Sequence, residues 1–186
     1  GVTQEVASIT QTTSRVNLDV EDQLTVNGAF DHAAGSVSGG GTLTVNGRYT
    51  LAPSGFGELL APATTVLNGG LTWTDGDLSG GGTTIINGAS TVQAEDCFSS
   101  PVVLDNFRRL ELNATLAITA GCISLESGAT FVVGPEGTVD FQAADTDIRP
   151  VDESTSLPTL INNGTIVKTA GASGASTIGW QSDFFG

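Results

Sequence analysis

Short segments of the chain place apolar residues at positions i and i+2, with a mostly polar residue between them. This period of two is typical of β-strands with one buried face. Between the segments stand Asn-Gly, Ser-Gly and Ser-Gly-Gly-Gly sequences, which are turn signals. No stretch has the period of an amphipathic helix. The pattern therefore predicts an all-β chain with strands over 24–26, 43–45, 49–51, 71–73, 110–112, 123–125, 131–133 and 139–141.

These segments belong to an internal repeat. Residues 27–51 align with residues 68–92 without a gap, at an offset of 41, and eleven of the 25 aligned pairs are identical. A weaker copy at 118–130 aligns with 78–90, and 162–171 repeats the phrase that begins at residue 68. Repeats of this length predict a solenoid, in which each coil stacks on the one before it.

Many short strands fit either an antiparallel sandwich or barrel, or a parallel β-helix. The gapless repeat favours the β-helix, because stacking coils place like residues above like, about 4.8 Å apart. We interpret the offset of 41 as two coils of roughly 20 residues, which gives roughly nine coils for the chain. Glycine adopts left-handed backbone angles without strain and asparagine tolerates them. The Ser-Gly-Gly-Gly and Asn-Gly sequences are therefore expected to form the corners.

We expect one solenoid domain over residues 1–186. Its predicted parts are an N-terminal coil (1–22), the main repeats (23–144), an inserted loop (145–159) and a terminal partial repeat (160–186). The loop is predicted because this acidic stretch interrupts the pattern.

The sequences LTWTDGDLSGGGTTIINGAST and NNGTIVKTAGASGASTIGW resemble the repeats of large secreted β-helix proteins of bacteria, the adhesin-like and haemagglutinin-like surface proteins. The resemblance extends from about residue 24 to residue 180. It implies a right-handed parallel β-helix (β-solenoid), export and a role at the cell surface. It brings no catalytic motif.

The charge balance excludes two classes of partner. The chain has six Lys and Arg residues and 20 Asp and Glu residues, which gives a net charge of −14. No basic surface is therefore expected that could bind nucleic acid or anionic lipid. No apolar run approaches the length of a membrane span. Cys97 and Cys122 are an even pair in an acidic, Gly-rich and Thr-rich chain, which favours a disulfide in a secreted protein over two buried thiols.

The two ends of the chain lack a recognisable cap. The chain begins GVTQ, which is typical of a processed product or a piece cut from a longer protein. An uncapped solenoid exposes unpaired strand edges. We therefore expect either a longer rod or end-to-end assembly of copies into a fibre.

The acidic turns are candidate sites for chemistry. Asp75 and Asp77 flank Gly76 and offer the hard oxygen ligands that calcium prefers. Paired carboxylates would also suit polysaccharide hydrolysis. The equivalents of these residues in the first repeat copy are Ala34 and Ser36, so the repeat builds no carboxylate pair. A solvated acidic turn is the expected role, with calcium as the one cofactor to test.

Arg108 and Arg109 form the basic cluster that a polysaccharide lyase would need to abstract a proton. Their expected role is instead to pair with neighbouring acids such as Glu111 or Asp105. We therefore predict a protein that is not an enzyme.

Two further groups of residues are candidates for ligands or modification. Trp73 and Trp180 could stack on sugars. Trp73 aligns with His32, and this polar equivalent mildly favours an exposed ligand-binding face, although a half-buried structural tryptophan is the favoured interpretation. Asn113 and Asn163 begin the sequons NAT and NGT and are candidates for glycosylation.

The threonines suggest one more reading. A flat face with one Thr-x-Thr pair per coil would indicate ice binding. The segments 42–44 and 64–66 fit that pattern, but along the sequence it is not sustained. The threonines are therefore expected to serve strand propensity alone.

These features predict a non-enzymatic extracellular structural or adhesive module. It would act as a stiff spacer, a fibre subunit, or a binder of glycans or another cell-surface ligand. One alternative is a carbohydrate-active β-helix protein, either a polysaccharide lyase or hydrolase or a sugar-binding module. The other is a subunit of a self-assembling extracellular filament.

Overall fold

The computed structural model describes residues 1–13, 16–52, 58–150, 156–169 and 174–179. These residues form 21 β-strands and no helix. Every pairing between the strands is parallel. The prediction of a parallel β-solenoid is therefore confirmed.

The strands form three faces that run the length of the solenoid. The first face contains β1 (Thr3–Val6), β4 (Gln23–Val26), the second halves of β6 (Ser36–Val45) and β8 (Glu58–Leu67), β11 (Thr83–Ile86), β14 (Arg109–Leu112), β17 (Thr130–Val133) and β20 (Thr159–Asn162). The second face contains β2 (Ile9–Gln11), β5 (Phe30–His32), β7 (Tyr49–Leu51), β9 (Leu71–Trp73), β12 (Ser90–Gln93), β15 (Thr115–Ala120), β18 (Thr138–Phe141) and β21 (Thr165–Lys168).

The third face joins the first through its longest strands. It contains β3 (Asn17–Asp19), the first halves of β6 and β8, β10 (Asp77–Ser79), β13 (Val102–Leu104), β16 (Cys122–Leu125) and β19 (Asp147–Pro150). Because β6 and β8 pass around the corner between the third and first faces, these two faces count as one 13-stranded sheet beside the 8-stranded second face.

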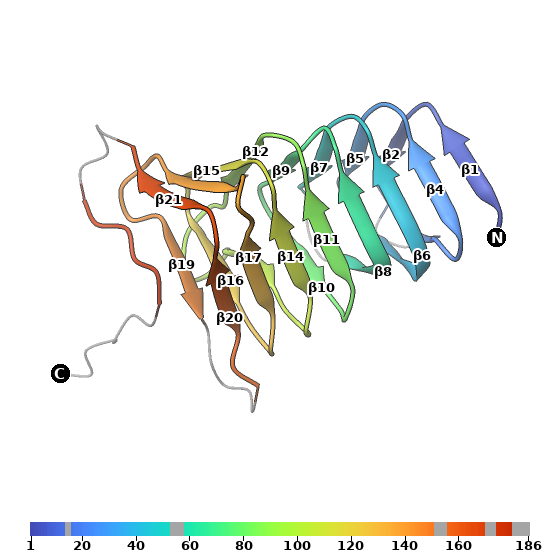
Figure 1. Cartoon of the computed structure of the whole chain (residues 1–186). Coiled ribbons are helices and arrows are strands. Elements are labelled where there is room, and N and C mark those ends of the chain that lie inside the picture. Colours follow the sequence, from blue (N-terminus) through green and yellow to red (C-terminus); the bar gives the residue numbers. More distant parts are fainter. Residues whose placement is uncertain (14–15, 53–57, 151–155, 170–173, 180–186) are drawn as a thin grey trace.

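The winding is right-handed, as the sequence resemblance implies. In Figure 1 the near strands β4, β6 and β11 run upward, and the chain then crosses to the more distant strands β5, β7 and β12. Each coil advances from right to left, and an upward near side with a leftward advance is a right-handed helix.

The coils are less uniform than the repeat predicts. The first face advances by 19 to 29 residues from one strand to the next. Eight strands occupy this face, and the last coil has two strands in the described residues. The chain therefore makes fewer turns than the roughly nine predicted, because its later coils carry insertions.

Two boundaries in the predicted repeat are wrong. Residues 147–150 form β19 and pair with β16, so the inserted loop predicted over 145–159 contains a regular strand. The copy predicted at 118–130 is also out of register, because Leu78 stacks on Leu104 and Leu104 on Leu125, a total step of 47 residues rather than 40. The extra residues lie between β12 and β13, in the loop that carries Cys97.

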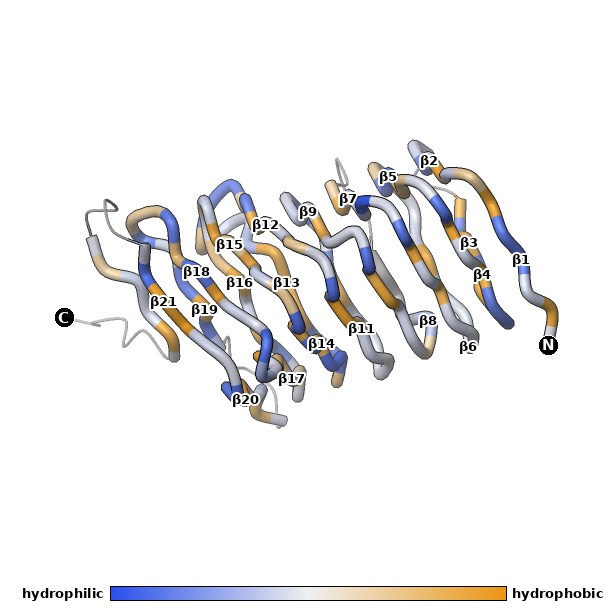
Figure 2. The backbone as a smooth tube through the Cα atoms, turned by 45° about the horizontal axis from the view of Figure 1, so that its top comes forward, coloured by the Kyte–Doolittle hydropathy of each residue, from blue (hydrophilic) through white to orange (hydrophobic). Residues whose placement is uncertain are grey.

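The core consists of stacked inward-facing side chains. Figure 2 shows apolar segments recurring at similar places on successive strands. Burying each Val, Leu or Ile side chain contributes roughly 1.5–3 kcal/mol, which is what holds one coil on the next. One column of fully buried residues on the first face consists of Val26, Val45, Leu67, Ile86, Leu112 and Val133.

Glycines occupy the corners for geometric reasons, as predicted. Gly39 and Gly80, the first glycines of the two Ser-Gly-Gly-Gly sequences, have φ angles of 120° and 81°. Residues other than glycine rarely adopt backbone angles in this left-handed region, because their Cβ atom clashes there. A Cβ atom on Gly47, in an Asn-Gly corner, would lie 2.4 Å from the backbone of Gly28 in the coil before it. Any larger residue would push these coils apart.

The corner asparagines have a different role from the one predicted. None of them is among the described non-glycine residues with positive φ, which are Asn106, Phe107, Ser127 and Asp145. They stack instead as an exposed ladder in which each side-chain Nδ2 donates to the Oδ1 of the coil before. The four hydrogen bonds run from Asn46 to Asn27 (3.2 Å), Asn68 to Asn46 (2.9 Å), Asn87 to Asn68 (3.0 Å) and Asn113 to Asn87 (3.1 Å).

Candidate functional site

The first face carries the most regular outer surface of the described solenoid. Its outward side chains form two parallel ranks, which we call the threonine face. The first rank is Thr3, Gln23, Thr42, Thr64, Thr83, Arg109, Thr130 and Thr159, and the second is Glu5, Thr25, Thr44, Val66, Ile85, Glu111, Val132 and Ile161.

The alternation of the strands points these residues away from the core, although Val132 is itself only 7% exposed. In β4, β6 and β14 the residues between the two ranks are Leu24, Leu43 and Leu110, which face the core. Thr, Val and Ile are β-branched and favour the extended backbone. Strand propensity and an outward array of β-branched side chains therefore come from the same residues.

The spacing within the threonine face is set by the backbone. Neighbouring coils lie about 4.8 Å apart, and residues i and i+2 on one strand are about 6.6 Å apart. The register along the first-face segments is unbroken from β1 to β20. Figure 1 shows β4, β6, β8, β11 and β14 lying side by side and nearly parallel. The two ranks thus repeat in two directions.

The middle of this face carries no charge. We call Thr42, Thr44, Thr64, Val66, Thr83 and Ile85 the central patch; all six side chains are half-buried by their neighbours. Beyond it the Arg109 Nε lies 2.6 Å from the Glu111 carboxylate, so this pair interrupts both ranks with a neutral ion pair. In a chain of net charge −14, the central patch is a neutral surface of hydroxyl and methyl groups.

This array was not predicted from the sequence, because the threonine pairs are not evenly spaced along the chain. Thr42 stacks on Thr64 after 22 residues, and Thr64 stacks on Thr83 after 19. The coil after Thr83 is longer, so the later pairs fall out of any fixed period. The available signal was the phrase Thr-apolar-β-branched, which recurs at 130–132 and 159–161.

Trp73 has a structural role, as the favoured interpretation of the sequence had it, and the candidate sugar-binding face of Trp73 and His32 is wrong. Both side chains are fully buried. They lie in the same inward column, where Leu51 separates His32 from Trp73. The Trp73 indole Nε1 donates a hydrogen bond of 2.9 Å to the carbonyl oxygen of Gly76. The polar equivalent of Trp73 in the repeat is therefore another core residue, and Trp180 lies outside the described residues.

His32 is held in the neutral form inside the solenoid. Its Nε2 lies 3.0 Å from the carbonyl oxygen of Gly35, and its Nδ1 lies 2.8 Å from the hydroxyl of Tyr49. Since a carbonyl only accepts, Nε2 carries the proton and Nδ1 accepts from the hydroxyl. Burial lowers the pKa of His32 and raises the pKa of Tyr49.

This imidazole predicts that acid destabilises the protein well above the carboxylate range. The unfolded chain takes up a proton near pH 6.5, whereas the folded chain resists it, so stability falls as the pH drops below about 6.5. The slope from one proton is at most about 1.4 kcal/mol per pH unit. Thermal unfolding of wild type and His32→Gln between pH 7.5 and 5 measures it. Gln11 occupies the equivalent position one coil earlier, so glutamine fits the column.

The difference between the two proteins isolates His32, which is the single histidine of the chain. Burial raises the pKa of Glu126, which gives a slope of opposite sign at lower pH, but this residue is present in both proteins. Parallel profiles for wild type and variant would contradict the prediction.

Asp75 and Asp77 stand on either side of Gly76 at the start of β10. The Asp75 Oδ1 accepts the backbone N–H of Gly76 at 2.8 Å and so closes its own turn. Asp77 begins β10, where its neighbours in register are Glu58 and Val103. Among the described residues, the one group of three potential metal ligands is Cys97, Cys122 and Asp147, and this group includes neither aspartate.

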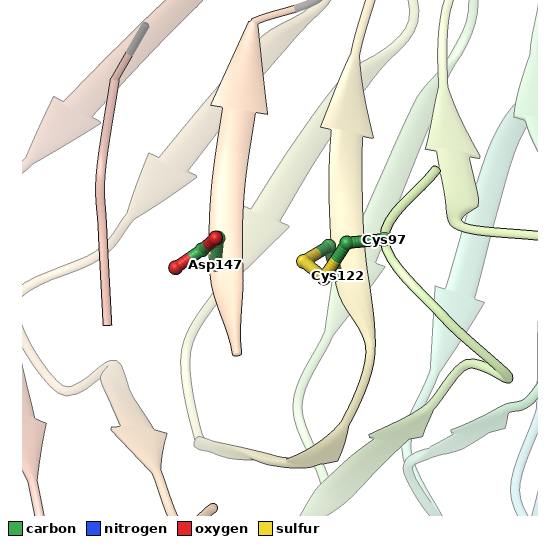
Figure 3. A group of neighbouring side chains, drawn as sticks. All are labelled: Cys97, Cys122 and Asp147. Atoms are coloured by element: carbon green, nitrogen blue, oxygen red, sulfur yellow. A yellow bond between two sulfur atoms is a disulfide. The ribbon is translucent and has the colours of Figure 1, made fainter. Parts of the chain in front are cut away.

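That group is a disulfide beside a carboxylate rather than three free ligands. Cys97 and Cys122 are bonded to each other, as predicted. Figure 3 shows Cys122 on β16, Cys97 on the neighbouring loop, and Asp147 on the adjacent strand β19. Asp147 already binds Arg149, whose Nη2 lies 2.8 Å from its Oδ2. The disulfide sulfurs have lost the thiolate that a metal requires.

The two arginines of the predicted basic cluster have separate environments. Arg109 pairs with Glu111, as predicted. Arg108 is fully buried, and its guanidinium donates to neutral oxygens of Thr84, Thr65 and Pro62. Its contact with Asp105 is a backbone hydrogen bond, from the Arg108 N–H to the Asp105 carbonyl oxygen, and not an ion pair. Arg108 is therefore unavailable to a substrate.

The two sequons are exposed, as glycosylation would require. Asn113 ends the asparagine ladder, and its Nδ2 donates to Asn87. Asn163 occupies an exposed corner after β20. The presence of a glycan at either residue stays a prediction.

No protein-family model matches this chain, and neither a curated protein nor a solved structure matches it. Within the described residues, there is no helix with the length and apolar character needed to cross a membrane.

Proposed function

We propose that the protein is a non-enzymatic extracellular module, a stiff rod that adheres to a surface through its threonine face. The observation that carries this proposal is the in-register outer array of the first face. Such an array offers many weak contacts at fixed spacing, and their strength adds only when the partner is also extended. The disulfide fits an extracellular location, because such bonds persist in oxidising compartments.

The described side chains argue against the carbohydrate-active alternative. A hydrolase needs two carboxylates facing one substrate, whereas Asp75 closes its own turn. A lyase needs an accessible base, whereas Arg108 is buried and Arg109 is paired. The aromatic platform of a sugar-binding module would have been Trp73, which lies in the core.

A filament subunit is a second candidate, supported by the first coil. The edges of β1, β2 and β3 have no partner strand among the described residues beyond β4, β5 and β6. A hollow lined by Ile9, Gln11, Val16 and Leu18 opens beside them. A coil of another copy would pair these edges. Light scattering over rising concentration distinguishes the candidates, since growth beyond the 18.8 kDa monomer supports the filament.

Co-sedimentation with insoluble solids tests the adhesive proposal. The purified chain is offered separately to ice, microcrystalline cellulose, chitin and intact bacterial cells, and the soluble fraction is assayed for reducing sugars and unsaturated products. We expect retention on at least one solid without release of product. Retention on none of them, or accumulation of cleavage products, would overturn the proposal.

A further inference from the structure

We infer that the threonine face binds ice. This inference rests on the proposed adhesive function and names the solid that the face would recognise. It uses the central patch, Thr42, Thr44, Thr64, Val66, Thr83 and Ile85, as the middle of the contact surface.

The side chains of the central patch form a periodic array. A soluble ligand needs one pocket, whereas the central patch repeats the same two side-chain positions on successive coils. The repeat distances are about 4.8 Å across the coils and about 6.6 Å along each strand. A partner that uses every position must repeat in both directions as well. Ice presents oxygen atoms on a lattice with repeats of this order, so it is a partner of the required kind.

The side chains of the central patch combine hydroxyl and methyl groups. Each threonine presents one hydroxyl, which donates and accepts, and one methyl group. Val66 and Ile85 present methyl groups at equivalent positions in the second rank. Hydroxyls can join a lattice of water molecules, while the methyl groups between them exclude disordered water. A surface with this mixture of hydroxyl and methyl groups is better suited to binding ordered water than to binding an apolar protein surface.

Charge distinguishes the central patch from the chain as a whole. The chain carries a net charge of −14, yet the central patch carries none. A neutral patch complements a neutral solid and gives no advantage with a mineral or a charged polymer. The two ranks also contain no aromatic residue for stacking on crystalline polysaccharide. Among the candidate solids, ice is the one that needs neither charge nor aromatic rings.

The side chains of the central patch are held rigidly. The β-branched side chains have few accessible χ1 rotamers, and neighbours in the coils above and below half-bury each of them. Their hydroxyl and methyl positions are therefore largely fixed before binding. A fixed array loses little conformational entropy when it meets a fixed lattice.

Thermal hysteresis and ice-crystal shaping of the full chain test this inference. The test variant is Thr64→Tyr, which places a bulky ring between Thr42 and Thr83. The matched control is Thr72→Tyr, which makes the same change at an outward threonine of the second face, between Thr50 and Thr91. We expect wild type and Thr72→Tyr to shape ice crystals, and Thr64→Tyr to lose about tenfold in activity.

Circular dichroism and thermal unfolding establish that each variant is folded. If Thr64→Tyr does not fold, Thr44→Lys in the second rank replaces it with the same expected loss. Absence of hysteresis and ice shaping in the wild type would overturn the inference, as would equal activity of the first-face and second-face variants. Retention on another solid in the co-sedimentation assay, with no effect on ice, would overturn ice binding while leaving the adhesive function in place.

Discussion

Replacing Arg108 with alanine is expected to lower the free energy of unfolding by about 3 kcal/mol. For a protein of this size that loss corresponds to a fall of roughly 6–12 °C in the melting temperature. Thermal and urea unfolding of wild type and Arg108→Ala measure the difference. Replacing an Arg on the surface of a repeat protein would change the melting temperature little, so the size of the effect tests whether Arg108 is buried.

The reason is that Arg108 connects three coils from inside. It follows the corner before β14, and its Nε and Nη2 lie 3.0 and 2.7 Å from the Thr84 hydroxyl. The same Nη2 lies 3.3 Å from the Thr65 hydroxyl, and Nη1 lies 3.2 Å from the Pro62 carbonyl oxygen. Alanine leaves these oxygens without their donor and opens a cavity.

The charge of Arg108 opposes this stabilisation. Burial lowers the pKa of Arg108 to about 10, so the guanidinium remains charged at neutral pH although its hydrogen bonds go to neutral oxygens. Removing a poorly compensated buried charge is favourable in itself. The lost hydrogen bonds and the cavity outweigh that gain because the alanine variant leaves the polar partners in place.

A compensated variant separates these contributions. In the inward column of the first face, Leu24 and Leu43 precede Thr65 and Thr84, and Leu110 follows them. Changing Arg108→Met together with Thr65→Val and Thr84→Val removes the donor and both threonine acceptors at once, and leaves the Pro62 carbonyl oxygen in place. We expect this triple variant to lie within about 1 kcal/mol of wild type or to exceed it. A triple variant as unstable as Arg108→Ala would show that packing, rather than the unpaired oxygens, dominates the loss.

The fold was predictable from two local patterns. Period-two apolar segments indicate strands whatever their partners are. The offset of 41 between the two copies is the sum of two coil steps that alternate strand by strand, for example Thr42 to Thr64 and Thr64 to Thr83. The prediction failed after residue 92, where the loop that carries Cys97 lengthens the coil and the repeat no longer reports which residues stack.

The candidate site was harder to predict than the fold, because side-chain direction depends on register between coils. Trp73 and His32 alternate correctly with their neighbours, but alternation alone does not say which set faces the core. Arg108 was expected to meet an acid and instead meets two threonines in an otherwise apolar column. One signal was present: Leu43 aligns with Thr84 in the repeat, and a polar residue in a leucine position calls for a buried partner.

Removing the disulfide is expected to lower the free energy of unfolding by about 3 kcal/mol, or roughly 6–12 °C in melting temperature. Cys97 and Cys122 are 25 residues apart in sequence, and cross-linking them restricts the unfolded chain. The measurement compares wild type with Cys97→Ser/Cys122→Ser, each with and without dithiothreitol. Reductant is expected to shift the wild type alone, which makes the double variant the control for other effects of the reagent.

Other contacts decide how far the effect spreads along the solenoid. The loop of Cys97 also rests on β19, where the Arg149 guanidinium lies 4.5 Å from the Phe98 ring centre and its Nη1 lies 3.5 Å from the Cys97 carbonyl oxygen. The Asp96 carboxylate accepts the backbone N–H groups of Phe98 and Ser99 and keeps the loop folded on itself.

Ala94 is the one residue of this loop in the described core, so the coils should stay stacked after reduction. Hydrogen exchange should therefore increase first in residues 94–101, while β11 and β14 stay protected at the level of the whole molecule. If the loss of the disulfide instead exposes β11 and β14 together with the loop, the solenoid unfolds as one cooperative unit and the loop is part of its core.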